Sequence, residues 1–161
     1  DEINLSYQLA IRLPEKADEI VNEQLKRISN PDRQAEYRFI SPSVSTRKEV
    51  RDSVFEALLV ADNRRIEPWA STALSLLNHR LREAESVEYI RPALEILEEV
   101  QRTGDIFFPT AWLRALLGGH SSVQARDEVE AFYAEYPDFP EMLLNKIRQQ
   151  ADHLYRLHAG E

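Results

Sequence analysis

The placement of proline and glycine constrains this sequence most strongly, because between these residues the apolar side chains follow a helical period. Only four glycines and eight prolines interrupt the chain, and most of them separate one apolar stretch from the next. Within a stretch, apolar residues recur every three to four positions, which gives a helix one face that can be buried. No stretch sustains the alternation typical of a half-buried strand. The pattern therefore predicts an all-α fold.

The expected helices cover most of the chain. They span about residues 3–12, 14–28, 31–40, 46–61, 86–104, 105–117, 121–136 and 138–157, with another opening at Glu67-Pro68. Pairs of them begin near residues 15, 46, 86 and 121, a mean spacing of roughly 35 residues, which is typical of solenoids built from helical hairpins. We predict an irregular HEAT-like stack of helical hairpins, an α-α superhelix of about eight or nine helices. An ordinary helical bundle remains the alternative.

Local signals suggest where individual helices begin and end. Asn30 before Pro31 is the usual order of an N-cap and a first helical residue. Ser86 is expected to cap one helix, and Gly104 to end it in a left-handed conformation. Pro92 lies inside an otherwise helical pattern. Three pairs have the spacing of a capping box, namely Thr46 with Glu49, Ser121 with Gln124 and Asp138 with Glu141.

Charge and composition argue against several classes of partner. The chain has 28 acidic and 20 basic residues, a net charge of −8, so it should repel nucleic acids and anionic lipids. The basic doublet Arg64-Arg65 lies between Asp62 and Glu67, and we expect it to be a solvated loop pair. Cysteine is absent, which excludes disulfides and thiolate metal sites. The longest apolar run, 57–61, is too short to span a bilayer. We expect neither nucleic-acid binding nor membrane insertion, and no localisation is predicted.

The histidines lack the spacing of a metal site. A zinc hydrolase needs two histidines one helical turn apart and a third ligand. His153 and His158 are five residues apart, which turns them off a shared helix face, and His79 and His120 stand alone near helix ends. Histidine at a helix end more often makes a capping or dipole contact. No metal ligand is therefore predicted.

Other kinds of chemistry are no better supported. The stretch 118–122, Gly-Gly-His-Ser-Ser, suggests a phosphate-binding nest at a helix start, but no lysine follows it and a tight turn is the simpler interpretation. Acid pairs such as Glu98-Glu99 and Asp127-Glu128 point away from each other on a helix, which is typical of a solvated face. Large aromatics are expected in the core, namely Trp69, Phe107, Phe108, Trp112, Phe132 and Tyr136. We therefore predict no catalytic residue and no cofactor-binding residue.

Four stretches nevertheless resemble a known family. Together they look like the C-terminal helical domain of bacterial zinc aminopeptidases of the aminopeptidase N family, over about residues 15–157. They are Phe39–Ser45 followed by Arg51–Phe55; Asn63–Trp69; Thr103–Leu113 with Gly119–Ser122; and Tyr136–Pro140 with Lys146-Ile147 and Ala151-Asp152. These motifs consist of caps, turns and buried aromatics, so they indicate a family segment rather than an activity.

The resemblance implies a specific role. The parent would be a multidomain zinc metallopeptidase that removes N-terminal residues from peptides, with its zinc motif in an upstream catalytic domain. The C-terminal domain would pack on that catalytic domain as a HEAT-like bowl and would limit the access of peptide substrates to the cavity. We accordingly expect residues 1–161 to form one helical-repeat domain cut from a larger protein, with zinc only in the missing domain. The alternative is an independent helical scaffold that binds protein partners.

Overall fold

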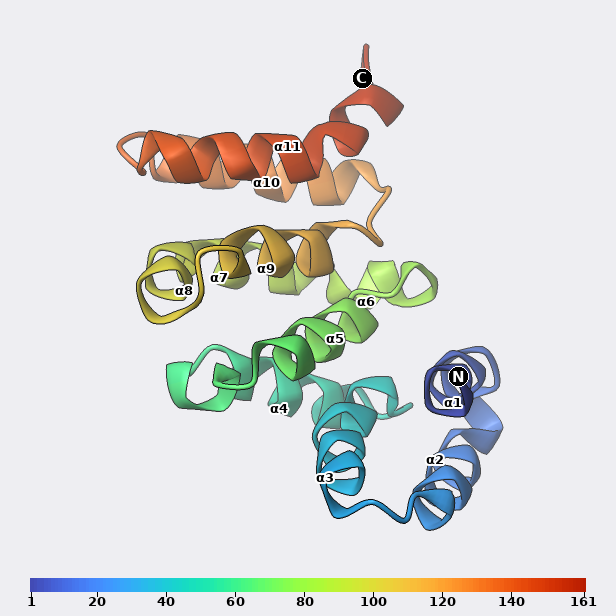
Figure 1. The fold of residues 1–161 in the computed structure, drawn as a ribbon. Coiled ribbons are helices and arrows are strands. Elements are labelled where there is room, and N and C mark those ends of the chain that lie inside the picture. Colours follow the sequence, from blue (N-terminus) through green and yellow to red (C-terminus); the bar gives the residue numbers. More distant parts are fainter. The chain divides into compact units, whose positions relative to one another are not determined.

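The computed structural model describes residues 1–161, and it is helical throughout, with no strand (Figure 1). The residues divide into two compact units, Asp1–Leu77 and Asn78–Glu161. Its α-helices run from α1 to α11 with short 3-10 turns between them, close to the eight or nine that the sequence predicts. The predicted all-α stack of helical hairpins is confirmed. The expectation of one domain over residues 1–161 stays a prediction.

In the first unit, a hairpin of two helices packs beside a second group of three. Its elements are α1 (Glu2–Arg12), η1 (Pro14–Lys16), α2 (Ala17–Arg27), α3 (Pro31–Ile40), η2 (Ser41–Val44), α4 (Lys48–Leu58), η3 (Ala61–Arg64) and α5 (Glu67–Leu77). The rings of Tyr7 and Tyr37 stack with centroids 5.2 Å apart. The hydroxyls of Ser6 and Tyr37 are 2.8 Å apart, which satisfies Tyr37, whereas the buried Tyr7 hydroxyl has no hydrogen-bond partner.

In the second unit, two layers of helical hairpins are stacked. Its elements are η4 (Arg80–Arg82), α6 (Glu83–Ser86), η5 (Val87–Tyr89), α7 (Ile90–Glu95), α8 (Leu97–Thr103), α9 (Phe108–Leu117), α10 (Val123–Glu135) and α11 (Glu141–Leu157). Helix α10 packs on α7, and α11 packs on α9. The indole of Trp112 on α9 is fully buried, and its Nε1 donates to the Ala93 carbonyl of α7 at 3.1 Å.

Some predicted helix ends are confirmed. The Oδ1 atom of Asn30 accepts from the amides of Asp32 and Arg33, and Pro31 is the first residue of α3. Pro92 also finds a normal place, because it is the third residue of α7, where no amide is needed for the helical ladder.

The three predicted capping boxes are wrong. The N-cap of helix α4 is Arg47, one residue after Thr46, and no side chain caps the helix. The Arg47 amide donates to the Ser45 hydroxyl. Helix α10 is capped by Ser122, one residue later than Ser121, through the Ala125 amide at 3.1 Å. The N-cap of helix α11 is Pro140, and no side chain caps the helix, so Asp138 is not its N-cap. Small polar residues are adjacent at these starts, and tertiary contacts decide which of them the helix uses.

Two further expectations are also corrected. Ser86 is the last residue of α6 rather than a cap, and its buried hydroxyl has no hydrogen-bond partner. Gly104 does follow α8, but with φ −113° and ψ 178°, which is extended backbone that any residue can adopt. Phe107 is 77% exposed rather than buried, because it belongs to the α8–α9 turn and not to a helix face.

Candidate functional site

The residues that carry the family resemblance mainly complete the fold. The last carbonyl groups of helix α4 take partners from beyond the helix, and two residues of the 63–69 stretch bond to them. The Nδ2 atom of Asn63 donates to the Ala57 carbonyl at 3.0 Å, and Nη1 of the buried Arg64 donates to the Leu58 carbonyl at 2.9 Å. The expectation that Arg64 lies in a solvated loop is therefore wrong, because the residue is 3% exposed and its guanidinium bonds to the end of α4.

His120 is held in the neutral form. Its ring is 1% exposed, and Nε2 lies 2.8 Å from Oδ1 of Asn78. Burial lowers the pKa of His120 to about 4, against a smaller opposing effect of Glu83. The Nδ1 atom is buried without a hydrogen-bond partner. The side chain is therefore a buried anchor of the α9–α10 loop.

Two other histidines, His153 on α11 and His158 directly after it, contact the same loop. Nε2 of His153 lies 2.9 Å from the His120 carbonyl. Nε2 of His158 lies 2.7 Å from the Ser121 carbonyl, while its Nδ1 lies 3.0 Å from the Glu161 carboxylate. The Ser121 carbonyl, with Glu161 adding to it, raises the pKa of His158. The fold thus brings together three histidines that sequence spacing alone did not connect.

The Gly118–Ser122 loop is a packed turn rather than an open anion site. The Glu83 carboxylate accepts from the Ser121 amide at 2.9 Å and from its hydroxyl at 3.1 Å. That carboxylate already occupies the amide that a phosphate would use. At Gly119, a Cβ atom would lie 2.1 Å from the Asn78 carbonyl oxygen, so only glycine fits there. The tight turn, the simpler of the two predicted interpretations, is favoured.

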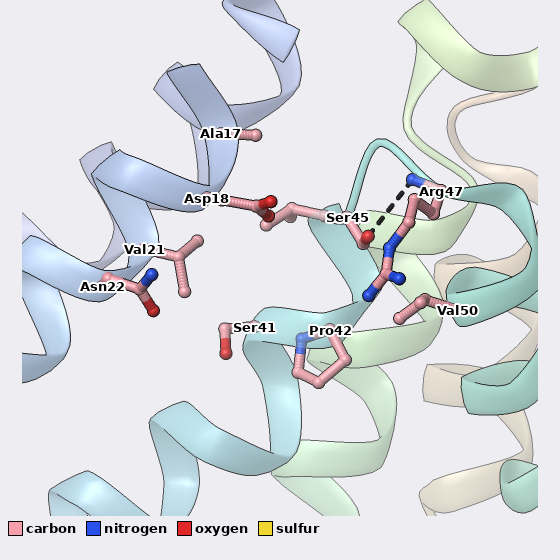
Figure 2. Close-up of a pocket in the computed structure, with 10 residues that line it drawn as sticks. Ala17, Asp18, Val21, Asn22, Ser41, Pro42, Ser45, Arg47 and Val50 are labelled. Atoms are coloured by element: carbon pink, nitrogen blue, oxygen red, sulfur yellow. Dashed lines mark hydrogen bonds between the residues drawn. The ribbon is translucent and has the colours of Figure 1, made fainter. Parts of the chain in front are cut away.

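A small groove lies between α2 and the segment from η2 to α4 (Figure 2). Its volume is about 190 Å³. Asp18 on α2 and Arg47 before α4 line it from opposite sides, with Ser41 and Ser45 between them (Figure 2). With a carboxylate on one side and a guanidinium on the other, the groove suits a small polar molecule that carries both a positive and a negative group. Sequence reasoning missed it because the lining residues are far apart in the chain, although the 39–45 stretch forms one wall.

A second groove, of about 380 Å³, lies between α10 and α11. The Arg148 guanidinium is 5.8 Å from the centre of the Tyr133 ring, and it also donates to Glu141 at 2.9 Å. The Tyr155 hydroxyl donates to Glu130. The charged groups here are already paired within the protein, so the groove offers little to a charged ligand.

The most exposed apolar side chains gather at one edge of the second unit. Ile106, Phe107 and Met142 are 79%, 77% and 66% exposed, the highest values among the exposed large hydrophobics. Lys146 contacts Thr110, and His153 contacts the Leu117 carbonyl. In each pair the two residues are 36 positions apart in the sequence, so α9 and α11 run parallel. The same register places Met142 level with Ile106. We call Ile106, Phe107 and Met142 the turn edge.

The turn edge is built on an ordered turn. The Asp105 carboxylate accepts from the Phe107 amide at 2.9 Å, and its carbonyl accepts from the Phe108 amide at 3.0 Å. Phe108 and Pro109 are buried directly behind. The α8–α9 and α10–α11 turns lie at the same end of the stacked hairpins (Figure 1). An ordered turn that exposes its large apolar side chains is typical of an interaction surface.

No family model, curated protein or solved structure matches this chain. Within the chain, no group of three or more histidine, aspartate or glutamate side chains is arranged to hold a metal ion. None of the helices combines the length and the apolar character that crossing a bilayer requires.

Proposed function

We propose that this chain is the non-catalytic C-terminal domain of a zinc aminopeptidase, which packs on the catalytic domain and encloses or gates the peptide-substrate cavity. The proposal starts from the motif resemblance, and the positions of the motif residues agree with it. Asn63 and Arg64 complete a helix end, and Trp112 and His120 are buried anchors. These roles suit a domain whose task is to hold a shape.

The observation that carries the docking role is the turn edge. Leaving three large apolar side chains more than half exposed at one end of a folded unit forgoes stabilisation of about 1.5–3 kcal/mol for each side chain that could be buried. Docking on a second domain would recover this free energy. The same edge also supports the second candidate, an independent helical scaffold that binds protein partners.

The gene upstream of the Asp1 codon separates the two candidates. An open reading frame that continues upstream and encodes two histidines one helical turn apart, with a downstream glutamate, is the expected result. A start codon close to Asp1 would instead favour the independent scaffold.

A hydrolysis assay tests the non-catalytic role directly. The purified chain should not cleave aminoacyl p-nitroanilides, with or without added zinc, whereas the polypeptide encoded by the whole gene should. Zinc-dependent turnover by the 161-residue chain alone would contradict the proposal.

A further inference from the structure

We infer that the turn edge docks against a protein surface that combines an apolar pocket with lysine or arginine side chains around it. This inference deepens the proposed function and rests on it for the identity of the partner as the catalytic domain. Its two components, apolar contact and charge, come from separate observations.

The apolar component is the turn edge itself. Ile106 and Phe107 are adjacent on the turn that precedes α9, and Met142 is the second residue of α11, at the same level. Aromatic and methionine side chains are enriched at the centres of protein interfaces. Phe107 and Met142 are of these types, and together with Ile106 they can enter one apolar pocket of a partner.

The charge component comes from the chain segments that lead into the turn edge. Residues 95–105 and 135–142 contain seven acidic residues and one basic residue, Arg102. Some of these acids are already paired, since Glu135 binds Arg91 at 2.7 Å and Glu141 binds Arg148 at 2.9 Å. Excess negative charge remains, and it is complementary to a basic partner.

A hollow beside α8 shows where a basic side chain would fit. Its volume is about 290 Å³, and its lining includes the acidic residues Glu98 and Asp138 and the rings of Tyr136 and Phe139. The Tyr136 hydroxyl donates to Glu95, which holds the ring in place. Carboxylates beside aromatic faces attract lysine and arginine by charge and by cation–π contact. The structure therefore assigns this hollow to a cationic side chain of the partner.

Charge also decides against other occupants. Phosphate groups of nucleic acids and anionic lipid headgroups would be repelled by this edge. A second copy of the chain would bring an equally acidic edge against it, and like charges across an interface are unfavourable. A basic, partly apolar protein surface is the occupant that satisfies both components.

Binding of designed peptides to the full chain tests the inference. Two amphipathic helical peptides of equal length are compared, one of leucine and lysine and one of leucine and glutamate. We expect the lysine peptide to bind, to shift the amide NMR signals of Glu98, Ile106, Phe107 and Met142, and to bind more weakly as salt is raised. Equal binding of the glutamate peptide, or shifts confined to other helices, would overturn the inference.

Matched variants separate the two components. The double variant Ile106→Ser/Phe107→Ser should weaken binding at least about tenfold, and Glu98→Gln/Asp138→Asn should weaken it and flatten the salt dependence. Leu157→Ser, at the far end of α11 and 60% exposed, is the control and should bind like the parent. If the control weakened peptide binding equally, binding would not be specific to the turn edge and the inference would fail.

Two further results keep this inference apart from the proposed function. Because all the substituted side chains are exposed or line a surface hollow, unchanged thermal unfolding should show that the variants fold. Sedimentation that reveals self-association abolished by Ile106→Ser/Phe107→Ser would assign the edge to a second copy and overturn the inference. A start codon near Asp1 would remove the catalytic domain as partner, whereas the peptide results would stand or fall independently.

Discussion

The Nε2 atom of His120 lies 2.8 Å from the Oδ1 atom of Asn78, and both side chains are buried. Since an amide oxygen only accepts, Nε2 carries the proton and donates it, and a neutral ring satisfies this bond. The other ring nitrogen, Nδ1, has no partner and no contact with water. The pair joins the start of the second unit to the α9–α10 loop, which makes that loop sensitive to protonation.

Acid should therefore weaken the fold through His120. The pKa falls from 6.5 in the unfolded chain to about 4 in the folded protein, so between these values the unfolded state binds more protons. The neutral His120 side chain therefore adds at most about 3 kcal/mol to the free energy of unfolding. This contribution is complete above pH 6.5 and is lost as the pH falls toward 4. Urea unfolding at a series of pH values measures it. His120→Gln should flatten the dependence in this window, and a parallel dependence in that variant would contradict the assignment.

Gly119 should tolerate no side chain. In Gly119→Ala the new Cβ would meet the Asn78 backbone carbonyl at 2.1 Å, and a backbone atom cannot move aside cheaply. We expect a loss of about 3 kcal/mol or more in the free energy of unfolding. Gly160→Ala is the control: nothing lies within 4 Å of its Cβ, and only its φ of +95° opposes the change. If both variants unfold at the same denaturant concentration, the close approach is not real.

How far the sequence predicts this fold depends on whether a residue acts locally. Asn30 and Pro31 form their cap with neighbours two and three residues away, and that prediction is confirmed. Ser121 and Ser122 are equivalent as local caps, and Glu83, 38 residues earlier, decides between them by binding Ser121. No local rule contains that contact.

The candidate site escaped prediction for the same reason. Phe107 has the spacing of a core residue when 105–117 is read as one helix, but α9 begins only at Phe108. The turn edge also needs the 36-residue register between α9 and α11, which a single sequence does not supply. Pro109 is the signal that was available, because a proline in the first turn of a helix places the start of α9 near Phe108 and leaves Phe107 outside it.

Trp112 should contribute through its indole nitrogen as well as its size. Trp112→Phe removes the Nε1 bond to the Ala93 carbonyl, leaves that carbonyl unsatisfied and opens a small cavity. A loss of about 2 kcal/mol is expected from the two effects together. Trp69→Phe is the matched control, because Trp69 is only partly buried, and it should cost less in the same chemical unfolding experiment. A larger loss at Trp69 would show that the Trp112 bond is of little consequence.

The acidic charge of the second unit should affect substrate capture in the parent aminopeptidase, if the proposed function holds. Residues 78–161 contain 15 acidic and nine basic residues, a net charge of −6, whereas peptide substrates carry a cationic amino terminus. Long-range attraction raises association rates and is screened by salt. We therefore expect kcat/KM for lysine-rich peptides to fall as ionic strength rises, and kcat/KM for acidic peptides of equal length to change little or to increase. Steady-state assays of the protein encoded by the whole gene measure both. If salt leaves the ratio between the two peptide classes unchanged, the charge of these helices does not steer substrates.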